Sequence, residues 1–83
     1  MTLRITRVDR DEEGTFLRID GRLEGKSLDE FEEACEGAPS PLTLDLEGVL
    51  WIDDRATETL RQLIASGTVV THASPYVALR LKG

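Results

Sequence analysis

The segment Pro41–Glu47 alternates apolar and polar residues, and this pattern constrains the fold more than any other part of the chain. In a β-strand, its apolar side chains would share one face and its polar side chains the other. The apolar face would hold Leu42, Leu44 and Leu46. A strand of a parallel sheet that is covered on both faces would be almost wholly apolar. We therefore expect a sheet whose helices pack mainly on one face, while the other face is at least partly wet.

Two more strands are expected before this segment. Residues 3–8 alternate in the same way, and residues 15–21 would place Leu17 and Ile19 on a buried face. The polar turn at residues 9–14 is short, which favours an antiparallel hairpin between the two strands.

The first helix is expected to follow an irregular segment bracketed by Gly21 and Gly25. Ser27 and Glu30 fit a capping box, in which the Ser27 hydroxyl accepts a backbone N–H bond and the Glu30 carboxylate accepts one from the Ser27 N–H. Gly37 is expected to end the helix. The residues expected on its inward face are Leu28, Phe31 and Cys35.

Helical spacing resumes after an apolar connection and the pair Asp53-Asp54. Either aspartate can serve as the N-cap of this second helix, and Gly67 suits its C-terminal end. The residues expected on its inner face are Ala56, Leu60, Leu63 and Ile64. Residues 68–71 would then form a short strand that completes a right-handed βαβ unit with residues 42–46.

A last helix is expected to open at Ser74-Pro75, with Ser74 as its cap. Its apolar contacts would be Val77, Leu79 and Leu81. The whole chain, residues 1–83, is therefore predicted to be one small α/β domain. It would have a mixed four-stranded sheet with helices mainly on one face.

Charge is unevenly distributed along the chain. The net charge is −6, and residues 27–54 contain nine acids and no Lys or Arg. A phosphate backbone or an anionic membrane surface would be repelled from this stretch, so we expect neither partner. A basic protein surface is the natural complement. The alternative is a solvated helix face that only keeps the protein soluble.

The sequence also bears on the compartment. Its single cysteine cannot form an internal disulfide, and a secreted domain of this size normally uses several. No apolar run approaches the roughly 20 residues of a membrane span, and the first residues do not resemble a signal peptide. We expect a cytoplasmic protein that does not itself insert into a membrane.

Few residues suit catalysis. Cys35 is expected on a buried helix face, and His72, the only histidine, stands after the fourth strand in a surface or capping role. Asp45, Asp53 and Asp54 raise the idea of a metal site or an aspartyl-phosphate site, but such sites need about three converging oxygens. No glycine-rich phosphate loop, zinc-ligand spacing or Ser/His/Asp set is present. The sequence predicts no enzyme, no cofactor and no metal.

One longer segment resembles a known family. Residues 44–60 are similar to the central signature of STAS domains, the fold of anti-sigma factor antagonists. That signature has a strand with D-L-x-x-V, an aromatic or apolar pair, and D-S-x-G at the start of a helix with an apolar face. The segment Ala73–Val77 looks like the family's entry into its following helix.

The resemblance implies a bacterial protein-binding switch in signal transduction and transcription regulation, not an enzyme. In the antagonists, a Ser or Thr at the start of that helix is phosphorylated by a partner kinase that is also an anti-sigma factor. The unmodified antagonist binds this partner and frees the sigma factor, a mechanism called partner switching. The implied partner here is a protein, such as a kinase-like anti-sigma factor.

Several positions can be carried over from the signature. Asp53 matches the family's aspartate, and Asp54 stands where the phosphorylated Ser or Thr would be. Arg55 stands at the variable position, and Ala56 replaces the glycine, adding a methyl group that would hinder the close approach of a partner. The expected partner-binding segment is therefore Asp53–Thr57.

The aspartate at position 54 leaves two alternatives open. Its permanent charge of about −1 resembles the roughly −1.5 to −2 of a phosphate group, so Asp54 can mimic the modified state. It can equally be no more than a helix N-cap in a relative that has lost the switch. Thr57 and Thr59 are the only nearby hydroxyls that could replace the phosphorylated residue, and the acidic helix at residues 27–36 is expected nearby.

Two other functions remain open for a STAS-like domain. One is a subunit of a transport system, which would need a membrane-embedded partner. The other is a domain that binds a small ligand, a nucleotide or a lipid, although no phosphate-binding loop supports the nucleotide.

Overall fold

The computed structural model describes residues 3–82, which form a four-stranded sheet and three α-helices. The strands are β1 (Arg4–Asp9), β2 (Thr15–Leu23), β3 (Leu42–Ile52) and β4 (Val69–Thr71). The helices are α1 (Gly25–Glu36), α2 (Asp54–Ala65) and α3 (Pro75–Lys82). A single 3₁₀ turn at Asp11–Glu13 lies in the β1–β2 connection.

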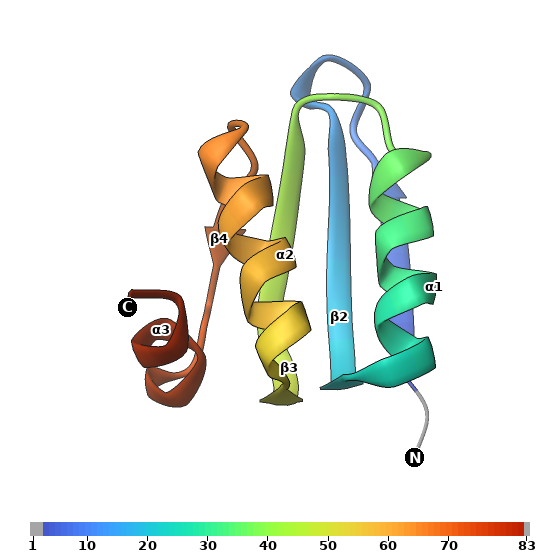
Figure 1. Cartoon of the computed structure of the whole chain (residues 1–83). Coiled ribbons are helices and arrows are strands. Elements are labelled where there is room, and N and C mark those ends of the chain that lie inside the picture. The colour runs from blue at the N-terminus through green and yellow to red at the C-terminus, as the bar shows by residue number, and fades with distance from the viewer. Residues whose placement is uncertain (1–2, 83) are drawn as a thin grey trace.

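The sheet is mixed, with the strand order β1-β2-β3-β4. β1 pairs antiparallel with β2, as the hairpin prediction requires, while β2 and β4 both pair parallel with β3. Figure 1 shows α1 and α2 side by side on one face of this sheet, and α3 beside α2 at the β4 side. The predicted fold, a small α/β domain with a mixed four-stranded sheet and helices mainly on one face, is confirmed.

The core lies between the sheet and the helices. Leu17 and Ile19 are fully buried on β2, and α1 contributes Leu28 and Phe31 from its predicted inward face. Cys35, further along that face, is only partly buried. The remaining core residues are Leu23, Leu42, Leu44, Leu46, Val49, Ile52, Ala56, Leu60 and Val77.

β3 is longer than the sequence indicates, because residues 48–52 continue the strand instead of forming a connection after it. The pairing of β3 with β2 shifts at two places, between Arg18 and Asp20 and again between Gly21 and Arg22. Each shift inserts one extra β3 residue, so the buried positions change from a spacing of two to a spacing of three. The simple alternation that marks a strand is lost there, although the strand itself continues.

The capping box predicted at Ser27 is wrong. α1 begins at Gly25, Glu24 occupies the N-cap without a side-chain bond, and the Ser27 N–H already donates to the Glu24 carbonyl. The segment before the helix is also regular, since β2 runs through Gly21 to Leu23. The Gly25 N–H instead donates to a carboxylate oxygen of Asp53, so a tertiary contact replaces the local cap.

The later caps agree better with prediction. Asp53 caps α2, and Ser74 caps α3 by accepting a bond from the Val77 N–H at 3.2 Å. Leu79 does not contact the core, because it lies two residues and about 200° around the helix from the buried Val77. Ile64, at the margin of the buried stripe of α2, is likewise exposed.

Candidate protein-interaction site

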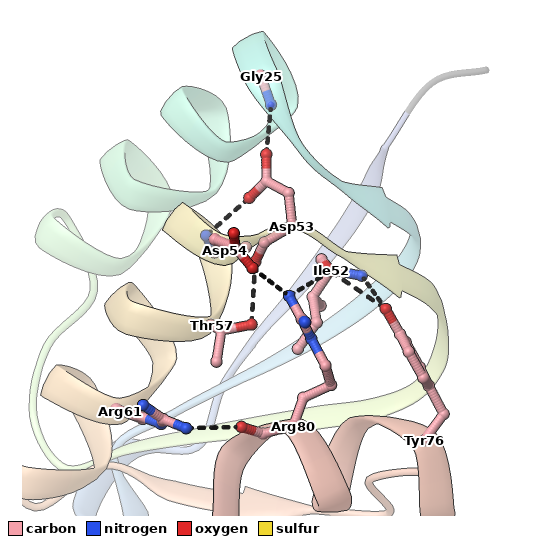
Figure 2. Close-up of polar contacts among 9 residues, drawn as sticks. Gly25, Ile52, Asp53, Asp54, Thr57, Arg61, Tyr76 and Arg80 are labelled. Atoms are coloured by element: carbon pink, nitrogen blue, oxygen red, sulfur yellow. Dashed lines mark hydrogen bonds and ion pairs between the residues drawn. The ribbon is translucent and has the colours of Figure 1, made fainter. Parts of the chain in front are cut away.

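Asp53 holds together the segments from which the candidate site is built. One carboxylate oxygen accepts from the Ala56 N–H at 2.8 Å, and the other accepts from the Gly25 N–H at 3.4 Å (Figure 2). The Asp53 N–H donates to the Leu23 carbonyl at 3.2 Å. A single residue therefore joins the end of β2, the start of α1 and the start of α2.

Asp54 projects into solvent, and its side chain is fully exposed. Its carboxylate makes an ion pair of 3.0 Å with Arg80 of α3, which also donates to the Ile52 carbonyl at 3.3 Å. Asp53 is the N-cap of α2, because its carboxylate accepts a hydrogen bond from the Ala56 N–H. The alternative in which Asp54 serves as the N-cap is therefore wrong.

Arg55 connects the site to the acidic helix α1. Its guanidinium lies 2.9 Å from the Asp29 carboxylate and 3.3 Å from that of Glu32. The hydrogen bond to Asp29, followed by the charges of Asp29 and Glu32, raises the pKa of Arg55. Arg55 of α2 thus contacts α1 through exposed ion pairs.

The remaining candidate residues point inward. Ala56 is fully buried, so its methyl group packs in the core and does not face a partner. Thr57 is buried and donates its hydroxyl to the Asp53 carbonyl at 2.9 Å. Thr59 is partly buried and donates to the Glu32 carboxylate at 2.9 Å. A kinase would have to displace these contacts before it could reach either hydroxyl.

The sequence reasoning missed the contribution of α3. The Tyr76 hydroxyl donates to the Ile52 carbonyl at 3.1 Å and accepts from the Ile52 N–H at 3.4 Å (Figure 2). Arg61 of α2 donates to the Arg80 carbonyl at 2.9 Å. The only available signal was the four-residue spacing of Tyr76 and Arg80, which places both side chains on one face of a helix.

Apolar side chains lie exposed next to this site. Trp51 stacks on Tyr76 with the ring centroids 5.8 Å apart, and the Arg22 guanidinium lies 5.6 Å from the Trp51 ring. Leu50, which precedes Trp51 in the sequence, is 69% exposed, and Leu79, three residues after Tyr76, is 72% exposed. We call the stacked rings of Trp51 and Tyr76 the apolar patch.

The other candidate groups do not join the site. Asp45 is buried, accepts from the Glu47 N–H at 3.0 Å, and lies 3.4 Å from Nδ1 of the exposed His72. Asp53 instead contacts the two helix starts. Within residues 3–82, no group of three or more His, Cys, Asp or Glu side chains is arranged to hold a metal ion.

Cys35 is expected to react slowly with thiol reagents. Burial, with smaller contributions from the charges of Glu32 and Glu36, raises its pKa from 9.0 to about 12. At pH 8 the thiolate should be up to about a thousandfold scarcer than in the unfolded chain. Iodoacetamide labelling followed by mass spectrometry should therefore be at least tenfold slower than in urea.

The raised pKa of Cys35 makes the stability of the protein depend on pH. Because the folded thiol holds its proton while the unfolded thiol loses it, stability that is present below pH 9 is lost progressively as the pH rises toward 12. The free energy of unfolding of Cys35→Ser should therefore fall less between pH 8 and pH 10 than that of the wild type, as measured by urea unfolding at the two pH values. Equal labelling rates in the folded and urea-unfolded protein would contradict the burial of the thiol.

Neither the family models nor the curated proteins that were searched match this sequence. Within the described part of the chain, no helix has the length and apolar character needed to cross a membrane.

Proposed function

We propose that this protein is a non-enzymatic interaction module that binds a protein partner through the exposed turn at Asp53–Arg55, in the manner of an anti-sigma factor antagonist of the STAS type. The observation that carries the proposal is the fully exposed carboxylate of Asp54, which pairs with Arg80 on the helix that also carries Tyr76 of the apolar patch. Exposed aromatic side chains are enriched at protein–protein interfaces, and charged groups at the rim of an interface contribute to partner choice.

The position of Asp54 supports a role as a permanent mimic of the phosphorylated state. Its charge stands in the first turn of α2, where the helix dipole favours a negative group. The ion pair with Arg80 orients the carboxylate without burying it. Because an exposed ion pair contributes little to stability, the pair can open at small cost when a partner binds.

The test is capture of a partner from the native host by tagged protein, followed by affinity measurement with the recovered protein. Asp54→Lys should weaken the recovered complex at least tenfold, because it reverses the charge that the partner is proposed to recognise. Asp54→Asn, which keeps the shape and removes the charge, should weaken it by a smaller factor. Circular dichroism would verify that both variants are folded.

Glu12→Lys is the matched control, since it makes the same change of charge on the exposed 3₁₀ turn outside the site. It should bind the partner like the wild type. The proposal fails if no protein partner is recovered, or if Asp54→Lys and Glu12→Lys bind equally well. Recovery of a membrane permease would favour the transport-subunit alternative instead.

A further inference from the structure

A second surface lies between α1 and α2, away from Asp53–Thr57. Two adjoining hollows of about 370 Å³ and 400 Å³ open there, and Cys35, Leu63 and Ser66 line both of them. Leu42 and Ala38 extend the lining of the first hollow. We call the two hollows together the α1–α2 groove.

The groove is closed at one end and open at the other. Near the start of α2, Arg55 and Thr59 bridge the two helices through their bonds to Glu32. Toward the end of α2, the hollows reach Ser66 and Gly67. Among residues 3–82, the side-chain hydrogen bonds between α1 and α2 lie near the start of α2, and Cys35 and Leu63 of the groove floor are partly exposed.

The rim of the groove is negatively charged, and of its two glutamates only Glu32 has a counterion, Arg55 at 3.3 Å. Glu32 and Glu36 line the second hollow, and none of the residues that line either hollow is basic. The last turn of α1 contains no basic residue either, although Glu33 and Glu36 stand there. Among residues 3–82, neither Glu33 nor Glu36 has a cationic group within 4.0 Å.

This arrangement is unfavourable for the isolated domain. Carboxylates near the C-terminus of a helix are repelled by the negative end of its dipole. The negative potential also reaches the groove floor, where Glu32 and Glu36 contribute to the raised pKa of Cys35. A bound cation at the end of α1 would be attracted by Glu33 and Glu36 and by the negative end of the helix dipole.

We propose that the α1–α2 groove binds a cationic amphipathic helix of a partner protein. An apolar side chain of that helix would occupy the hollow over Cys35 and Leu63, and a Lys or Arg side chain would contact Glu36 on the rim. An amphipathic helix lies in a groove in this way when its apolar residues recur at helical spacing, with charges along the margin. The acidic rim repels nucleic acid and anionic lipid, which favours a protein helix.

The test uses a fluorescently labelled synthetic peptide with leucines on one helical face and lysines on the other. Fluorescence anisotropy should show saturable binding, and amide NMR shifts on titration should concentrate at Cys35, Leu63 and Ser66. A peptide with the same composition, scrambled to remove the apolar face, should bind at least tenfold more weakly. Shifts concentrated on another surface would overturn the proposal.

Matched charge variants separate the groove from general electrostatic attraction. Glu33→Lys/Glu36→Lys changes the net charge from −6 to −2, since each substitution adds two charges, and Glu12→Lys/Glu13→Lys makes the same change on the 3₁₀ turn. The first pair should weaken peptide binding at least tenfold and the second less than threefold. Equal weakening by both pairs would overturn the proposal.

The groove variants are expected to fold, because lysines near the end of α1 agree with the helix dipole. Ser66→Tyr offers an independent variant that fills the hollow without changing the charge, and it should also weaken binding. Sedimentation of the wild type without peptide tests whether a second copy fills the groove. A dimer that Glu33→Lys/Glu36→Lys abolishes would assign the groove to self-association and overturn the proposal.

Discussion

Phe31→Ala is expected to lower the free energy of unfolding by about 3–5 kcal/mol. Phe31 is the largest fully buried side chain among the described residues, and it packs α1 onto the sheet. Truncation removes its apolar contacts and leaves a cavity that the neighbouring strands can close only in part. A domain of this length is stable by roughly 4–12 kcal/mol, so the variant should lose a large share of its stability.

Urea unfolding followed by fluorescence would measure this effect. Trp51 is the only tryptophan of the chain, and its stacking on Tyr76 makes its emission sensitive to unfolding. Glu33→Ala on the exposed side of the same helix is the control, and it should change stability by less than about 0.5 kcal/mol. A loss below about 1 kcal/mol for Phe31→Ala would contradict the packing of α1.

Local patterns in the sequence predicted most of the fold. The alternation at Leu42–Leu46 and the helical stripes of α1 and α2 placed the elements correctly, because burial on one face enforces a period of two or of 3.6 residues. Prediction failed where strand pairing or a tertiary contact overrides these local patterns. The register shifts in β3 hide its second half, and the Asp53 carboxylate makes the capping box at Ser27 unnecessary.

The sequence likewise predicted only part of the candidate site. Asp53 was identified as a possible N-cap because capping is a local interaction between residues close in sequence. The contacts of Tyr76 and Arg80 with Ile52 could not be predicted, since 24 and 28 residues separate the partners. The groove likewise depends on how far α1 and α2 stand apart, which no periodicity encodes.

Asp53→Ala is expected to destabilise the protein by about 2 kcal/mol, which is the upper part of the range for loss of an N-cap. The effect should be large because the same carboxylate also accepts the Gly25 N–H, so the starts of α1 and α2 both lose an acceptor. Asp53→Asn keeps an oxygen that can cap the helix, and it should cost less than about 1 kcal/mol. Urea unfolding of the three proteins under one set of conditions would measure both differences.

The pair of Asp53 variants also separates positioning from direct recognition. If Asp53 acts only by holding the turn, Asp53→Asn should bind a recovered partner within about threefold of the wild type, which is under 1 kcal/mol. Asp53→Ala should bind more weakly, because the start of α2 loses its cap and Asp54 and Arg80 are no longer held in place. A folded Asp53→Asn protein that has lost the partner would instead show that the Asp53 carboxylate itself contacts it.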